Sequence, residues 1–105
     1  MKEMEKIYER IKALSDVPTR SCPGCLHGLI SKMIAELVDQ YGVADRTVGI
    51  MPVGCGTMSK NVFTFDVFCA AHGRAPAVAT GFSRSAPEKI VFTYQGDGDL
   101  GAIGL

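Results

Sequence analysis

The stretch Lys89–Gly101, KIVFTYQGDGDLG, decides the fold, because an apolar run ends there in a glycine loop. The run at 90–94 predicts a buried strand, and the glycines after it predict a tight turn. The turn carries two carboxylates, Asp97 and Asp99, which would repel a bare phosphate held on the backbone. A divalent cation between Asp97 and the phosphate removes that conflict, since Mg²⁺ is typically bound by one or two carboxylates together with substrate phosphate oxygens. The stretch therefore predicts a Mg²⁺–diphosphate site at the end of a strand.

Composition limits the chain to one small globular domain. It has 105 residues, of which 47% are apolar and 21% are charged. Its 11 basic and 11 acidic residues balance, so the charge gives no indication of a nucleic-acid or anionic-membrane partner. No apolar run approaches the length of a membrane-spanning helix, and the charged N-terminus is not typical of a signal peptide. These features predict a cytoplasmic protein, and there paired cysteines more often serve metal or redox chemistry than structural disulfides.

Outward from the glycine loop, the spacing of apolar residues predicts alternating helices and strands. In chain order these are a helix over 2–14, a loop over 16–25, a helix over 29–41 capped by Gly42, a strand over 47–53, an extended segment over 62–69, a helix from about Pro76 to Pro87, and the strand that runs into Gly96. Alternation of this kind, with glycine loops at strand ends, predicts a parallel α/β layer structure.

The cysteines indicate a second site. Cys22 and Cys25 lie on one tight loop, CPGC, a spacing that suits zinc, an iron–sulfur cluster or a redox disulfide. Cys55 lies in another glycine turn, where the backbone can approach a bound group closely. Cys69 falls on an apolar face and is interpreted as a small buried hydrophobe. The sequence therefore predicts a metal or cluster site with three ligands beside a metal–diphosphate loop, which is a pairing that suits an electron-generating cofactor next to an electron acceptor.

Four longer motifs carry a resemblance to a known family. They are CPGC-x-HG at 22–28, RTVGIMPVGC at 46–55, AAHGRAPAVATG at 70–81 and VFTYQGDGDLGAIG at 91–104. In this order and near this spacing they resemble the β subunit of the 2-oxoacid:ferredoxin oxidoreductases. The residues of these motifs are most similar to those of the 2-oxoisovalerate (branched-chain) type. The resemblance implies the parallel-sheet thiamine-diphosphate-binding fold, of which the chain is expected to be the N-terminal portion only. Residues 1–16 are then a helical extension, and 17–105 a truncated binding domain with an iron–sulfur loop.

Enzymes of this family oxidatively decarboxylate a 2-oxoacid with coenzyme A, giving acyl-CoA and CO₂ and reducing ferredoxin. The resemblance therefore implies thiamine diphosphate, Mg²⁺ and a [4Fe–4S] cluster as cofactors and an α subunit as partner, and we expect the isolated chain to be inactive. It implies that Cys22, Cys25 and Cys55 are cluster ligands, that Asp97 binds Mg²⁺, and that thiamine diphosphate is bound by Val53, Gly54, Cys55, Gly56, His72, Gly73, Arg74, Gly98 and Asp99. It assigns no catalytic residue.

Some positions next to these motifs carry further expectations. His27 is expected to brace the cluster loop. Leu26 and Gly56 depart from the family pattern and are expected to alter hydrogen bonding to the sulfurs. The family's second Mg²⁺-ligating side chain, an asparagine, and its fourth cluster cysteine are expected beyond Leu105.

Two other functions fit parts of the sequence. The first is a small non-catalytic module in which Cys22, Cys25, Cys55 and Cys69 bind zinc. The second is a dinucleotide-binding fragment, because the glycines at 96, 98 and 101 formally fit the G-x-G-x-x-G pattern. That pattern needs an acidic residue about 20 positions further on, and two aspartates inside the loop disfavour it.

Overall fold

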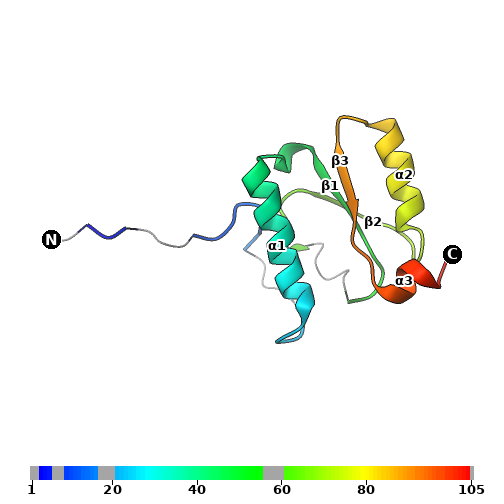
Figure 1. The fold of residues 1–105 in the computed structure, drawn as a ribbon, viewed down its shortest axis with the longest axis horizontal. Helices are drawn as coiled ribbons and strands as arrows, with labels where there is room; N and C mark the ends of the chain where they lie inside the picture. Colours follow the sequence, from blue (N-terminus) through cyan, green and yellow to red (C-terminus); the bar gives the residue numbers. More distant parts are fainter. Residues whose placement is uncertain (1–2, 6–8, 17–20, 56–60, 105) are drawn as a thin grey trace.

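The computed structural model describes residues 3–5, 9–16, 21–55 and 61–104, and these form a parallel sheet with helices on both faces (Figure 1). The elements are α1 (Leu26–Tyr41), the 3-10 turn η1 (Ala44–Arg46), β1 (Thr47–Met51), β2 (Asp66–Cys69), α2 (Ala75–Ser85), β3 (Ile90–Thr93) and α3 (Asp97–Gly101). The strand order is β2-β1-β3, and both pairings of β1 are parallel. The predicted parallel α/β architecture is confirmed.

The central strand β1 is buried along its whole length, and its side chains alternate between the two faces of the sheet. Val48 and Ile50 pack with Ala75 of α2 in one cluster. Met51 packs with Ala35 of α1 in the other. Figure 1 accordingly shows α1 and α2 on opposite sides of the strands. A strand covered on both faces explains why TVGIM is apolar apart from its first residue.

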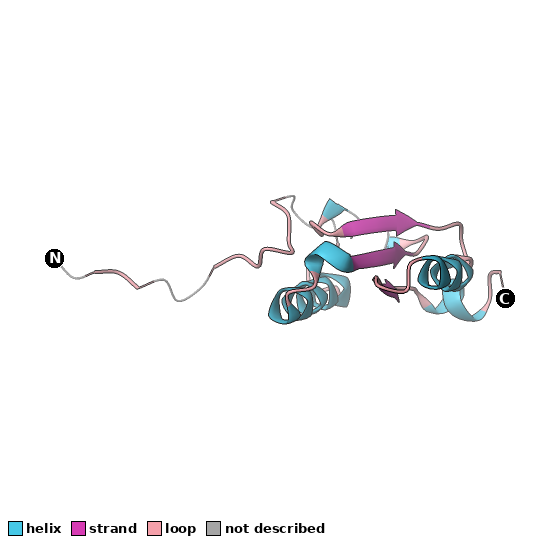
Figure 2. Ribbon diagram, turned by 90° about the horizontal axis from the view of Figure 1, so that it is seen from above, coloured by secondary structure: helices cyan, strands magenta, loops and turns pink. Residues whose placement is uncertain are grey.

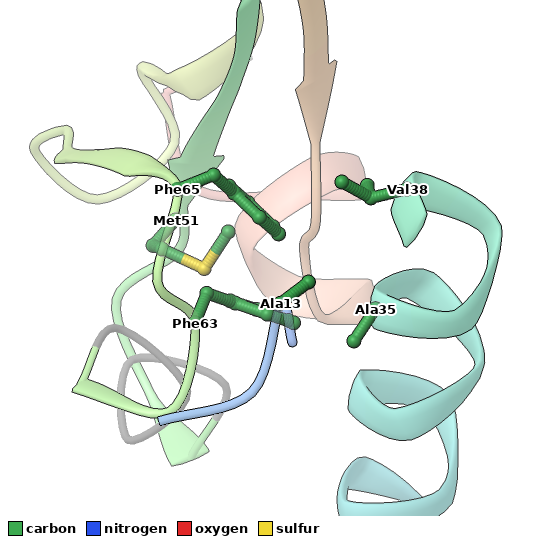
Figure 3. Packing of buried hydrophobic residues seen from close by; sticks show 6 residues of the cluster. All are labelled: Ala13, Ala35, Val38, Met51, Phe63 and Phe65. Carbon is green, nitrogen blue, oxygen red and sulfur yellow. The ribbon is translucent and has the colours of Figure 1, made fainter. Parts of the chain in front are cut away.

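The cluster under α1 fixes this helix against the sheet (Figure 3). Its buried members are Ala13, Ala35, Val38, Met51, Phe63 and Phe65. The rings of Phe63 and Phe65 stack with centroids 4.6 Å apart, and Phe65 meets Phe92 edge-on at 5.9 Å. Each such aromatic pair contributes about 0.5–1.5 kcal/mol beyond the area that it buries. The segment before β2 is therefore held in the core by aromatic packing.

Both predicted longer helices are confirmed. α1 begins at Leu26, directly after the CPGC loop, and ends at Tyr41; its C-cap, Gly42, adopts the left-handed conformation with φ of 63°. In α2 a proline lies in the first turn, where its missing N–H costs no hydrogen bond, and the helix ends at Ser85, two residues before Pro87. None of the helices in the described chain has the length and apolarity that crossing a bilayer requires.

The predicted helix over 2–14 is wrong for the part that the structure describes (Figure 2). Leu14 instead forms an antiparallel bridge with Phe63, and the N–H of Thr64 donates to the carbonyl of Ala13 at 2.9 Å. The N–H of Ala13 donates to Asp39 Oδ2 at 3.1 Å. The backbone of this segment thus pairs with distant groups, and a short helix is marginal without a face to bury. The expected domain boundary at residue 16 stays a prediction.

The outer strands are less buried than the sequence predicts. β3 has a partner on one side only among the described strands, and Ile90 is 39% exposed, so the expected buried strand is a half-buried one. Of the predicted extended segment 62–69, the stretch 66–69 forms strand β2. Cys69 is exposed rather than buried, because it ends the other outer strand.

Candidate functional site

A cavity of about 310 Å³ lies at the carboxyl edge of the sheet, where the loops after the strands converge. Its lining residues are His27, Pro52, Val53, Gly54, Cys55, His72, Tyr94, Gly96, Asp97, Gly98 and Asp99. They come from the loop after β1, the loop after β2, the loop after β3 with the start of α3, and the first turn of α1. In open parallel sheets, ligands bind in the crevice outside the carboxyl ends of the strands. This cavity is therefore the candidate binding site.

Asp99 joins two of these loops. Its carboxylate is buried, and Oδ1 accepts the backbone N–H of Gly73 at 2.8 Å and contacts Nδ1 of His72. Oδ2 accepts a hydrogen bond from Nε2 of Gln95 at 3.1 Å. The bond from Gly73 and then that from His72 hold the pKa of Asp99 below its usual value. The carboxylate thus stays ionised and ties the loop after β2 to α3.

The turn at Gly73 is also held by close backbone contact. Gly73 has φ of 77°, and a Cβ at this position would overlap the carbonyl of Ile103. Arg74, exposed at the start of α2, donates from Nη1 to the carbonyl of Gly104 at 2.9 Å. Its side chain is thereby directed to the segment after α3, and neither Gly73 nor Arg74 lines the cavity.

Asp97 differs from Asp99 in every respect that matters for a metal. It is exposed at the first position of α3 and lines the cavity. Within the part of the chain that the structure describes, no hydrogen bond or ion pair engages its carboxylate. A carboxylate with uncommitted oxygens beside a cavity is the donor that Mg²⁺ requires.

A pair of rings closes the cavity on the side of α1. Nδ1 of His27 contacts the hydroxyl of Tyr94, and the rings meet edge-on with centroids 5.6 Å apart. Burial raises the pKa of Tyr94, and like-charge repulsion from the nearby Cys25 sulfur adds to the effect. Because Cys25 is the N-cap of α1 and His27, two residues later, lines the cavity, the CPGC loop lies next to the cavity. Sequence reasoning treated Tyr94 as a strand residue, although an aromatic side chain with a polar tip at the carboxyl end of a strand is itself a signal for a site.

The cysteines do not gather around one point. Cys22 and Cys55 are exposed, Cys25 is half-buried, and all are free thiols. Among the described residues, no three His, Cys, Asp or Glu side chains lie close enough to hold one metal ion. A structural zinc site needs four ligands in tetrahedral contact with one ion. In the described part of the chain, therefore, neither the four cysteines of the zinc alternative nor the three predicted cluster ligands converge on one point.

The structure brings together most of the residues predicted to bind the cofactor. Those at the cavity are Val53, Gly54, Cys55, His72, Gly98 and Asp99, together with Asp97, the predicted Mg²⁺ ligand, whereas Gly73 and Arg74 do not line it and Gly56 falls outside the described residues. Cys22 and Cys25 lie on the adjoining loop before α1.

Comparison with known proteins gives consistent similarities. Residues 52–105 match the family model of the thiamine pyrophosphate enzyme, C-terminal TPP binding domain. The chain is 43% identical over 102 residues to ketoisovalerate oxidoreductase subunit VorA of Methanothermobacter marburgensis, an alignment that covers 97% of this chain and 21% of the relative. It is 35% identical over 88 residues to 2-oxoglutarate synthase subunit KorB of Archaeoglobus fulgidus, covering 84% and 33% respectively.

A solved structure has the same fold. It is a 2-oxoglutarate:ferredoxin oxidoreductase from Magnetococcus marinus with 2-oxoglutarate, coenzyme A and succinyl-CoA bound. The TM-score is 0.81 at 33% sequence identity, and the match covers 88% of this chain and 32% of that one. The chain thus spans between a fifth and a third of the length of these relatives. The resemblance found in the sequence is confirmed.

Proposed function

Because the chain belongs to the thiamine pyrophosphate enzymes, whose TPP-binding domain matches residues 52–105, we propose that its cavity binds thiamine diphosphate through a Mg²⁺ ion held by Asp97. The observation that carries this proposal is the contrast between two neighbouring aspartates. Asp99 is committed to three protein donors, whereas Asp97 lines the cavity with its oxygens uncommitted. Mg²⁺ bound to one such carboxylate would take the diphosphate oxygens as further ligands.

The protein residues supply position and charge. Thiamine diphosphate, when bound, supplies an electron sink for decarboxylation. Because the Asp99 carboxylate can only accept, the proton of the His72 contact sits on Nδ1, which leaves Nε2 as the ring nitrogen available for other contacts. Val53 and Gly54 line the cavity directly after β1. Gly54 has φ of 130°, a backbone conformation that favours glycine, and without a side chain it leaves the backbone open to the cavity.

We propose Cys22, Cys25 and Cys55 as ligands of a [4Fe–4S] cluster beside this site. Thiolates are the ligands that iron–sulfur clusters require. Cys55 lines the cavity, and Cys25 directly precedes the first turn of α1, whose His27 also lines it. A cluster held there would be adjacent to the thiamine site, as electron transfer between the two needs. The fourth ligand and the second Mg²⁺ ligand are expected in the remainder of the subunit.

For the whole enzyme we propose oxidative decarboxylation of a 2-oxoacid with coenzyme A, with ferredoxin as electron acceptor and an α subunit as partner, in the cytoplasm. Two relatives of the chain, a ketoisovalerate oxidoreductase subunit and a 2-oxoglutarate synthase subunit, support this reaction class. The higher identity to the ketoisovalerate enzyme, 43% against 35%, favours a branched-chain 2-oxoacid.

The test uses the full-length subunit in its complex, purified anaerobically and freed of thiamine diphosphate. Calorimetric titration with thiamine diphosphate should show binding in Mg²⁺ and none in excess EDTA. The reconstituted complex should then reduce a viologen dye when given 2-oxoisovalerate and coenzyme A, and more slowly with 2-oxoglutarate or pyruvate. Absence of thiamine diphosphate binding would refute the function, and equal rates on all three acids would remove the branched-chain assignment.

A further inference from the structure

The first turn of α1 buries little apolar surface against the rest of the molecule. Leu26 is 65% exposed and Leu29 is 54% exposed, whereas the buried residues of the helix begin at Ser31. The N-cap residue, Cys25, makes no side-chain capping bond. The turn that carries the CPGC loop therefore draws little stability from the core, and polar contacts decide where it lies.

His27 supplies such a contact. It lies in this first turn, and its Nδ1 meets the hydroxyl of Tyr94, which is 67 residues away in the chain. The edge-on arrangement of the two rings adds a favourable aromatic contact. Loss of this pair would leave the turn with exposed leucines and an uncapped start.

Tyr94 is fixed at its other end by the sheet. Its backbone N–H donates to the carbonyl of Ile50 in β1 at 3.1 Å, so the tyrosine continues the strand pairing beyond β3. Two residues later Gly96 begins the loop that presents Asp97 to the cavity. The ring pair thus connects the first turn of α1 to the loop that carries Asp97, and both rings line the same cavity.

We propose that the Tyr94–His27 pair is the link that holds the CPGC loop on the cofactor cavity, so that thiamine diphosphate binding and ordering of the loop stabilise each other. This inference rests on the proposed function, because it takes the cavity as the thiamine diphosphate site. Both are positioning residues: they act by placing the two loops. Any group that packs into the cavity against both rings stabilises the paired arrangement, and coupling of this kind is reciprocal.

A double-mutant cycle tests the link. In the full-length complex, Tyr94→Phe removes the hydroxyl and keeps the ring, and His27→Phe keeps an aromatic ring and removes Nδ1. Each single variant should weaken thiamine diphosphate binding about 3- to 10-fold, the range expected for loss of one hydrogen bond. The double variant should be no weaker than the weaker single variant, because both remove the same interaction. Losses that multiply, or no loss at all, would overturn the proposal. Tyr41→Phe, on the exposed far end of α1, is the matched control and should bind like the wild type.

Hydrogen–deuterium exchange gives a readout that is independent of affinity. On addition of thiamine diphosphate and Mg²⁺, the wild-type complex should gain protection both at 96–99 and at 22–30. At saturating cofactor, Tyr94→Phe should keep the protection at 96–99 and lose the gain at 22–30. Protection at 96–99 alone in the wild type would refute the link and leave the proposed function standing. Protection at neither segment would refute the proposed function and this inference with it.

Discussion

The carboxylate of Asp99 accepts the backbone N–H of Gly73 at 2.8 Å across 26 residues of sequence. Asp99 lies on α3, which follows β3, and Gly73 lies on the turn between β2 and α2. The bond therefore joins loops from the two outer strands across the end of the central one. His72 contacts Oδ1 and Gln95 donates to Oδ2 of the same carboxylate, so Asp99 holds the two loops together where they line the cavity.

These hydrogen bonds to Asp99 predict a specific pH dependence of the protein's stability. The pKa of Asp99 is lowered, chiefly by the Gly73 bond, so its stabilising contribution is complete above the ordinary value of 3.8 and is lost as pH falls through the lower folded value. Asp99→Asn should lower the thermal midpoint of the full-length protein at pH 7. On acidification below pH 3.8 the wild type should lose more stability than the variant, so that the two curves converge. Thermal midpoints measured from pH 7 to pH 3 check this; parallel curves would mean that Asp99 is not the responsible group.

Gly73 should not tolerate a side chain. A Cβ would overlap the Ile103 carbonyl, and φ of 77° is unfavourable for any other residue, so Gly73→Ala should cost about 1–3 kcal/mol of unfolding free energy. Gly81→Ala is the control, because Gly81 lies inside α2 with open space around its Cβ position. It should stabilise the protein by about 0.5–1 kcal/mol. Denaturant unfolding of both variants measures the difference, and equal effects would contradict the close approach at Gly73.

Asp97 should matter for the cofactor and little for folding. Asp97→Asn should weaken Mg²⁺-dependent thiamine diphosphate binding by more than the roughly 10–100-fold that outer-shell partners contribute. Its thermal midpoint without cofactor should equal that of the wild type, because no described group depends on this carboxylate. Asp45→Asn, in the exposed turn η1, is the control. A variant of Asp97 that binds thiamine diphosphate normally would remove the Mg²⁺ assignment.

Cys55 should be required for the iron–sulfur cluster, whereas Cys69 should not. Cys55→Ser should lose most of the iron and acid-labile sulfide of the anaerobically purified complex, together with its visible absorption. Cys69→Ser should keep both, since Cys69 lies exposed at the end of an outer strand. Metal and sulfide analysis of the two variants provides the comparison. Colourless wild-type protein that holds zinc, which Cys69→Ser then loses, would support the zinc module instead.

The sequence predicted those features that depend on local pattern. The glycine loop after β3, the cap at Gly42 and the proline in the first turn of α2 each follow from what a single residue type permits. The helix expected over 2–14 failed for the opposite reason. Its periodicity is genuine, but the contact of Leu14 with Phe63 crosses half the chain and is invisible to a local window.

The candidate site divides in the same way. Asp97 was predicted because its chemistry is local to the glycine loop. The commitment of Asp99 to Gly73, and the pairing of Tyr94 with His27, depend on which strands are neighbours. Cys69 was likewise predicted to be buried, because it shares an alternating face with apolar residues. Such alternation does not reveal that β2 lies at the edge of the described sheet. Strand order is a property of the whole chain, which explains why these details required the structure.

The pairing of Ile50 with Thr93 between β1 and β3 has a consequence for how the site tolerates change. This register sets where the loop that carries Cys55 and the loop that carries Asp97 begin relative to each other. One residue inserted into either strand would shift one loop against the other by about 3.3 Å and turn the following side chains to the opposite face. Substitutions within the loops leave the register of the two strands unchanged. Evolution can therefore retune the cavity by exchanging loop residues, whereas a change in strand length dismantles it.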